Sequence, residues 1–160
     1  MTQLEIIGHK EENAQKVAMK LNELLADYHI YYMNLRGLHW NIQGPQFFAL
    51  HGKFEELYNN VAEKIDEIAE RILTLGQRPV HALSEFVGMN EVSGLKERTN
   101  ITDGKQAIEV VLDGFKYLLA KQRELLELAD EYNDEATNAM MSDYISEQEK
   151  LVWMFHATTK

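Results

Sequence analysis

Apolar residues recur at helical spacing along most of the chain, and turn-forming residues separate the periodic segments. The clearest stripe lies between residues 45 and 75, where apolar positions alternate in steps of four and three, the seam pattern of a helical bundle. No strand pattern of useful length interrupts these segments. We therefore expect one all-α domain over residues 1–160, with long helices at about residues 11–41, 45–75, 103–131 and 134–156.

The two prolines and several glycines fall at the breaks between these helices. Pro45 follows Gln43-Gly44 and is expected at the first position of the second helix. Gly76 is expected to end that helix. Residues 76–102 are then a long connection, with a short helix at about residues 82–87. A connection of this length can carry the chain from one end of a four-helix bundle to the other.

Composition limits the chemistry that this bundle can perform. Hydrophobic residues make up 45% of the chain and charged residues 26%, which is typical of a globular protein. There is no cysteine, so a bound metal would need His, Asp or Glu ligands. The formal net charge of −10 disfavours nucleic acid and favours cations. No membrane-spanning apolar run occurs, and residues 1–10 lack a signal core, which predicts a cytoplasmic protein.

Four side chains that can bind metal lie along the second expected helix: His51, Glu55, Asp66 and Glu70. At about 100° per residue, all four point within roughly one quarter of the helix surface. The apolar stripe occupies a different part, so the four residues face away from the bundle's own core. A charged helix face is also typical of simple exposure to solvent, so the alternative of a purely structural helical assembly stays open.

The spacing of these four residues matters as much as their direction. His51 and Asp66 are about 22 Å apart along the helix axis, whereas bonds from metal to His or carboxylate are about 2 Å long. One ion cannot bind both groups of one chain. The helix therefore carries two half-sites, His51 with Glu55 and Asp66 with Glu70. An antiparallel copy, related by a two-fold axis, would complete two equivalent sites.

His39 is the remaining candidate ligand, because the end of the first helix can bring it beside His51. Two histidines with carboxylates and open positions suit Fe(II). A site inside one bundle is less expected, since the usual di-iron bundle needs Glu-x-x-His motifs and no histidine here has Glu three residues earlier. Trp40 either packs beside the site or fills space. The other histidines are interpreted as non-ligands: His9, His29, His81 and His156.

Two segments make the chain similar to a known family. These are His39-Trp40-Asn41-Ile42-Gln43-Gly44, with His51 twelve residues after His39, and Asp66-Glu67-Ile68-Ala69-Glu70-Arg71. Over nearly its whole length the sequence resembles the Dps mini-ferritins of the ferritin-like superfamily, named for DNA protection during starvation. The resemblance implies a ferritin-like bundle in a homododecameric shell, with ferroxidase sites at two-fold interfaces. His39 and His51 would come from one subunit, and Asp66 and Glu70 from another. Glu55 stands where the family commonly has Asp.

The resemblance also implies a function. Such a protein oxidises iron from Fe2+ to Fe3+ with hydrogen peroxide, or sometimes oxygen, stores the ferric mineral and protects the cell from oxidative damage. Iron would enter through acidic three-fold pores, for which Asp130, Asp134 and Glu135 are candidates beside the alternative of ordinary turn acids.

The family name raises DNA binding or compaction as the alternative function. DNA-binding members often carry a mobile tail rich in Lys and Arg. Here the first twenty residues contain three lysines and also three glutamates, and Lys160 is the one basic residue at the C-terminus. We therefore expect weak or no DNA binding at physiological salt.

Overall fold

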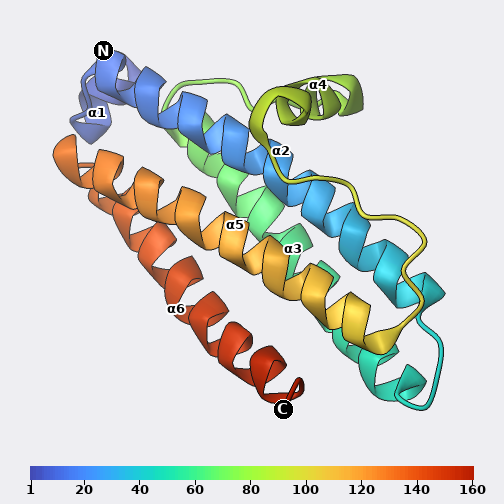
Figure 1. Ribbon diagram of the computed structural model, residues 1–160. Helices are drawn as coiled ribbons and strands as arrows, with labels where there is room; N and C mark the ends of the chain where they lie inside the picture. The colour runs from blue at the N-terminus through green and yellow to red at the C-terminus, as the bar shows by residue number, and fades with distance from the viewer.

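The computed structural model describes the backbone of residues 1–160 and the side chains of residues 1–92 and 94–160, and along this described chain it is all helical (Figure 1). The helices are α1 (Gln3–Ile7), α2 (Glu11–Asn41), α3 (Phe47–Thr74), α4 (Leu83–Ser93), α5 (Gly104–Glu131) and α6 (Glu135–Ala157). Helices α2, α3, α5 and α6 lie side by side as a bundle, and α4 lies on the outer side of α2 (Figure 1). The expected all-α, ferritin-like four-helix bundle is confirmed. None of the helices in the described chain is long and apolar enough to cross a membrane.

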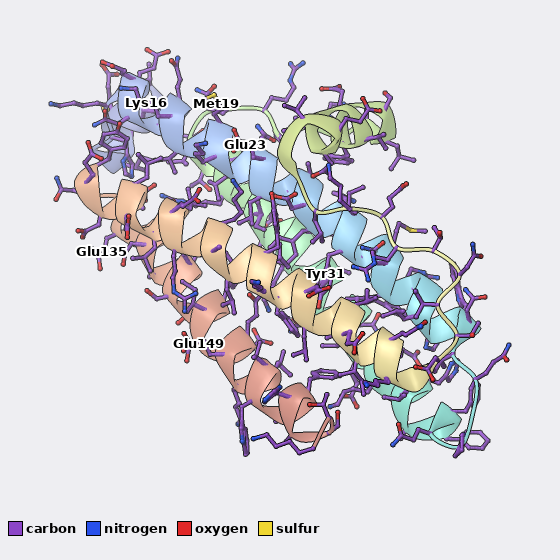
Figure 2. All side chains as sticks on the ribbon, in the orientation of Figure 1. Lys16, Met19, Glu23, Tyr31, Glu135 and Glu149 are labelled. Carbon is purple, nitrogen blue, oxygen red and sulfur yellow. The ribbon has the colours of Figure 1, made fainter. Side chains whose placement is uncertain are left out.

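The core forms where the apolar stripes of the four long helices meet. On α3 the buried stripe includes Phe54, Val61, Ile68 and Ile72, which follow the steps of four and three in the sequence. The aromatic ring of Tyr31 lies between α2 and α5, where its hydroxyl donates to the carbonyl oxygen of Val111 (Figure 2). The buried face of α3 therefore leaves its opposite, charged face outside the subunit's own core.

A closed ring of hydrogen bonds lies inside the bundle. The Tyr28 hydroxyl donates to Gln122, the Gln122 amide donates to Gln148 at 2.7 Å, and the Gln148 amide donates back to Tyr28 at 2.7 Å. The three residues come from α2, α5 and α6 and are at most 2% exposed. Since each group both donates and accepts, the ring satisfies these buried polar atoms without any charge. The interior at this level is thus filled by neutral side chains and not by carboxylates.

Three details differ from the expectations. Pro45 lies in the turn, and α3 begins two residues later at Phe47. Helix α4 runs past Val87 to Ser93, so the exposed Gly88 does not break the helix. Helix α1 was not expected at all, although the Thr2-x-x-Glu5 spacing forms a capping box and is readable in the sequence.

The connection between α3 and α5 (residues 75–103, the crossover) is held against α2 by hydrogen bonds from its backbone amides to side chains of α2. Side-chain oxygens of Asn22, Asp27 and Asn34 accept hydrogen bonds of 2.8–2.9 Å from the backbone amides of Val80, Leu95 and Arg98, respectively. On α4, Phe86 stacks on the ring of His29 of α2, with ring centroids 4.1 Å apart. The crossover is therefore fixed along the length of α2.

Asp27 gives the stability of the fold a pH dependence opposite to that of most carboxylates. Burial raises the pKa of Asp27 from 3.8 to about 6, against the opposing effects of the Leu95 amide and Lys121. Because the folded protein binds this proton more tightly than the unfolded chain, its stabilisation is complete below about pH 4 and is lost as the pH rises through about 6.

We therefore expect Asp27→Asn to gain up to about 3 kcal/mol in unfolding free energy, relative to the wild type, between about pH 4 and pH 7. The amide keeps an acceptor for Leu95 but removes the buried charge. Urea unfolding of both proteins across this range measures the difference. A difference that does not vary with pH would contradict the prediction.

Candidate metal site

The turn between α2 and α3 brings His39 and His51 into contact. Their rings are stacked, with centroids 3.8 Å apart and planes 15° from parallel. Nδ1 of each ring is 2.7 Å from the backbone carbonyl oxygen of the other histidine. His39 is 8% exposed and His51 is half-buried. The reciprocal bonds therefore tie the end of one helix to the start of the next through the two side chains themselves.

These bonds also decide which nitrogen of each ring is free. A carbonyl oxygen only accepts hydrogen bonds, so Nδ1 of both His39 and His51 must carry the proton. In the neutral imidazole the lone pair is then on Nε2, the atom that can bind a metal. A histidine ligand whose other nitrogen donates to a carbonyl is the usual arrangement at protein metal sites. The geometry thus prepares two adjacent nitrogen ligands.

Aromatic side chains of α3 hold the histidine pair on both sides. Phe47 stacks on His51, with ring centroids 4.9 Å apart, and the ring of Tyr58 meets His39 edge-on at 5.3 Å. In the sequence Tyr58 could be assigned only to the apolar stripe. Its position seven residues, about two turns, after His51 is the signal that places it on the same side of α3. Packing of this kind restricts the rotation of both imidazoles.

Trp40 does not fill space in the core. Its side chain is 56% exposed, and the guanidinium of Arg36 lies 4.8 Å from the centroid of its ring. The same guanidinium lies 4.8 Å from the ring of Tyr58 and donates to the hydroxyl of Tyr32 at 2.7 Å. Arg36 therefore connects Trp40 to Tyr58, which contacts His39, and sequence spacing alone did not indicate this connection.

The three carboxylates of the expected site lie on the exposed face of α3. Glu55 is one turn after His51, whereas Asp66 and Glu70 are near the other end of the helix, and all three are exposed. Helix α3 is continuous from Phe47 to Thr74, so the axial separation of about 22 Å between His51 and Asp66 stands. Within the described side chains of one chain, no three His, Asp or Glu residues converge on a possible metal position.

The acidic end of α3 is fixed to the start of α6 by Arg71. Its guanidinium pairs with Asp134 at 2.6 Å and donates to the Thr137 hydroxyl at 2.9 Å. Asp134 also caps α6 by accepting from the Thr137 amide and hydroxyl, and it is only 1% exposed. The expectation that Asp134 lines a pore is therefore wrong, because its carboxylate is enclosed within the subunit. Asp130 and Glu135 are exposed, and Glu135 lies at the beginning of α6 (Figure 2).

The other histidines occupy other positions along the chain. The pKa of His29 is lowered by its partial burial, consistent with the stacking of its ring on Phe86. His81 lies in the crossover, with Nδ1 3.1 Å from the carbonyl oxygen of Pro79. His9 follows α1, and His156 is in the last turn of α6.

Comparison with known proteins agrees with the fold. A model of the ferritin-like domain family matches residues 18–160. The crystal structure of a Dps protein from Vibrio cholerae O1, described as a member of the ferritin-like diiron-carboxylate proteins, is 53% identical. It covers 96% of this chain and 95% of its own, with a TM-score of 0.92. A Dps protein from Bacillus brevis is 36% identical, with a TM-score of 0.88, and covers 94% of this chain and 99% of its own.

A relative found by sequence comparison also supports this family. The DNA protection during starvation protein of Porphyromonas gingivalis is 44% identical over 154 residues, which are 96% of this chain and 95% of that protein. The fold and these matches define a ferritin-like four-helix-bundle protein. Within that class, the chain belongs to the Dps mini-ferritins. Membership of this family supports iron storage and stress protection, and it implies a homo-oligomeric assembly.

Proposed function

We propose that this protein is a ferroxidase and iron store that oxidises Fe(II) at sites shared between two copies of the chain. The observation that carries the proposal is the locked pair of His39 and His51, whose Nε2 atoms are both free to bind a metal. Two imidazole nitrogens are too few ligands for an iron site. Carboxylates must complete it, and the carboxylates on the same face of α3 include Asp66 and Glu70 at its far end.

A two-fold axis between two copies would bring together the half-sites that lie far apart on one α3 helix. When two α3 helices pack antiparallel, the histidine end of each lies beside the acidic end of the other. Each pocket then receives His39 and His51 from one copy and Asp66 and Glu70 from the second. The exposed side chain of Trp40 supports a contact at this place, because a large aromatic ring beside the site is covered when another copy packs there.

The proposed ligands suit oxidation of iron by a two-electron oxidant. Neutral imidazoles and carboxylates bind Fe(II), and the negative carboxylates favour the more highly charged Fe(III) that forms. Two Fe(II) ions each lose one electron, while one hydrogen peroxide molecule takes up two electrons and two protons to give two molecules of water. Because the electrons are delivered as a pair, no hydroxyl radical is released. The ferric product is then stored as mineral inside the shell, and molecular oxygen is the second possible oxidant.

Glu55 is proposed to serve the second, weaker iron position. It is one turn from His51 and exposed on the ligand face of α3. Its side chain is one methylene longer than the Asp that the resemblance leads us to expect there. The first iron position, which uses His39, His51, Asp66 and Glu70, does not depend on that difference.

DNA compaction is the alternative function, and it has less support. The formal net charge is −10 per chain, so an assembly of many copies is strongly anionic and repels the phosphate backbone. The N-terminal residues also lie in helix α1, which is held against the bundle.

Iron oxidation by the purified protein tests the proposal directly. After addition of Fe(II) and hydrogen peroxide, ferric absorbance should appear rapidly, and Asp66→Asn should slow it by about 100-fold because a charged ligand is lost. Asp66 is exposed within its own chain, so the helical content should not change, and particle size is measured to check that the variant still assembles. Glu109→Gln, an exposed carboxylate-to-amide change on α5, is the matched control. If both variants oxidise iron at the wild-type rate, the ligand assignment is wrong.

A further inference from the structure

Helix α1 is docked across the end of α3. The side-chain amide of Gln3 donates to the carbonyl oxygens of Leu73 and Thr74 at 3.0 and 2.7 Å. The side chain of Leu4 lies beside Gly76, the left-handed residue that ends α3. A helix of five residues is far too short to be stable in water alone, so its order depends on this docking.

Helix α1 is also well terminated for so short an element. At its start, the hydroxyl of Thr2 accepts from the Glu5 amide while the Glu5 carboxylate accepts from the Thr2 amide. At its end, Gly8 adopts a left-handed conformation and the His9 amide donates to the Leu4 carbonyl oxygen. These caps hold the backbone of Gln3 and Leu4 in the helix from which both side chains reach α3.

The docking completes the hydrogen bonding at the last turn of α3. The carbonyl oxygens of Arg71, Ile72 and Leu73 accept from the backbone amides of Leu75, Gln77 and Gly76, respectively. The carbonyl oxygen of Thr74 receives its hydrogen bond from Gln3. Since the final carbonyls of a helix have no partner within it, Gln3 supplies what the local turn does not.

This last turn lies directly after Glu70. The hydroxyl of Thr74 donates to the backbone carbonyl oxygen of Glu70 at 2.7 Å, which connects the capped turn to the acidic half-site. On the other side of α3, Arg71 is held by Asp134. Fraying of residues 71–75 would therefore free the backbone that orients the Glu70 carboxylate.

We infer that Gln3 is a positioning residue for iron: through α1 it clamps the end of α3 and holds the carboxylate of Glu70 in place for a second copy's histidines. This role rests on the proposed function, because it assumes that Glu70 is an iron ligand. The inference gives the N-terminal segment a role in holding the acidic half-site of the same chain. Gln3 does not touch the metal, so its effect should appear in iron affinity more than in the rate at saturation.

Two substitutions at one position separate this role from a general effect on the fold. Gln3→Glu places a carboxylate against two carbonyl oxygens at the negative end of a helix and should release α1. Gln3→Lys keeps a donor there and adds a favourable charge, so α1 should stay docked. Both variants are measured in the intact assembly. In Gln3→Glu the Fe(II) concentration for half-maximal oxidation should rise about three- to tenfold, with a nearly unchanged maximal rate. In Gln3→Lys this concentration should equal that of the wild type.

Hydrogen exchange of the Leu75, Gly76 and Gln77 amides reports the clamp itself. Exchange should be faster in Gln3→Glu and as slow as in the wild type in Gln3→Lys. An unchanged half-saturating Fe(II) concentration in Gln3→Glu, or equal losses in both variants, would overturn the inference while leaving the ferroxidase proposal intact. A wild-type protein that does not oxidise iron would overturn the proposed function itself, and the positioning role with it.

Discussion

Assemblies formed from a mixture of two inactive variants should recover about one quarter of the wild-type rate of iron oxidation. The first variant carries His39→Ala and His51→Ala, and the second carries Asp66→Asn and Glu70→Gln. Each alone should be slower than the wild type by at least about 100-fold, because every site then lacks its nitrogen or its carboxylate ligands. The experiment tests whether each site is built from two chains, as we propose because α3 keeps the two half-sites of one chain about 22 Å apart.

The expected fraction follows from symmetry. A dimer containing one copy of each variant has two sites. One joins both defects, and the other joins the intact histidines of one chain to the intact carboxylates of the other. Random pairing makes about half of all dimers mixed, and about half of the sites in these dimers are intact. Mixing must therefore be done by unfolding and reassembling the two variants together.

Two controls make the result decisive. The variants assembled separately and combined without reassembly should stay inactive. Particle size and helical content of each should match the wild type, which matters because His39 and His51 also bond each other's backbone. If the reassembled mixture shows no recovery although mixed assemblies form, the shared-site proposal is wrong.

Asp134→Ala should lower the free energy of unfolding by about 3–5 kcal/mol. The carboxylate is 1% exposed, pairs with the guanidinium of Arg71 at 2.6 Å and caps α6. Its removal leaves the largely buried charge of Arg71 without its carboxylate partner and the start of α6 without its cap. Urea unfolding at pH 7 and fixed subunit concentration measures the loss, since assembly makes apparent stability depend on concentration.

Asp103→Ala is the matched control for this prediction. Asp103 caps α5 by accepting from the Gln106 amide at 3.0 Å, but it is exposed. Its removal should cost about 1 kcal/mol, the usual value of an N-cap. Equal losses for the two variants would mean that the buried pair with Arg71 contributes nothing beyond capping.

The two aspartates illustrate why part of the candidate site could not be predicted. Both precede a helix in the sequence, and both could be interpreted as turn or cap residues. From its position in a turn, Asp134 was expected to be a surface acid suited to a pore. Its burial depends on the contact with Arg71, which is 63 residues away in the sequence. Local spacing indicates that a helix begins there, but it carries no information on which distant side chain faces that beginning.

Helix α1 was missed for a different reason. Its capping box and terminal glycine are local signals, yet five residues cannot form a stable helix without tertiary contacts. The contacts that stabilise it, from Gln3 to the end of α3, span about seventy residues of sequence. The signals in the sequence were therefore present, but the free energy that makes them effective comes from the packed bundle.

The sequence by itself determined the four long helices, the face of α3 that carries the candidate ligands and the distance between its two half-sites. These follow from the fixed rise and rotation per residue of an α-helix, which act over a few neighbouring residues. Only the tertiary structure decided that His39 and His51 bond each other's carbonyl oxygens, that Asp134 is enclosed and that Gln3 caps α3. Each of these depends on which groups meet when the helices pack, and the helical period does not specify that.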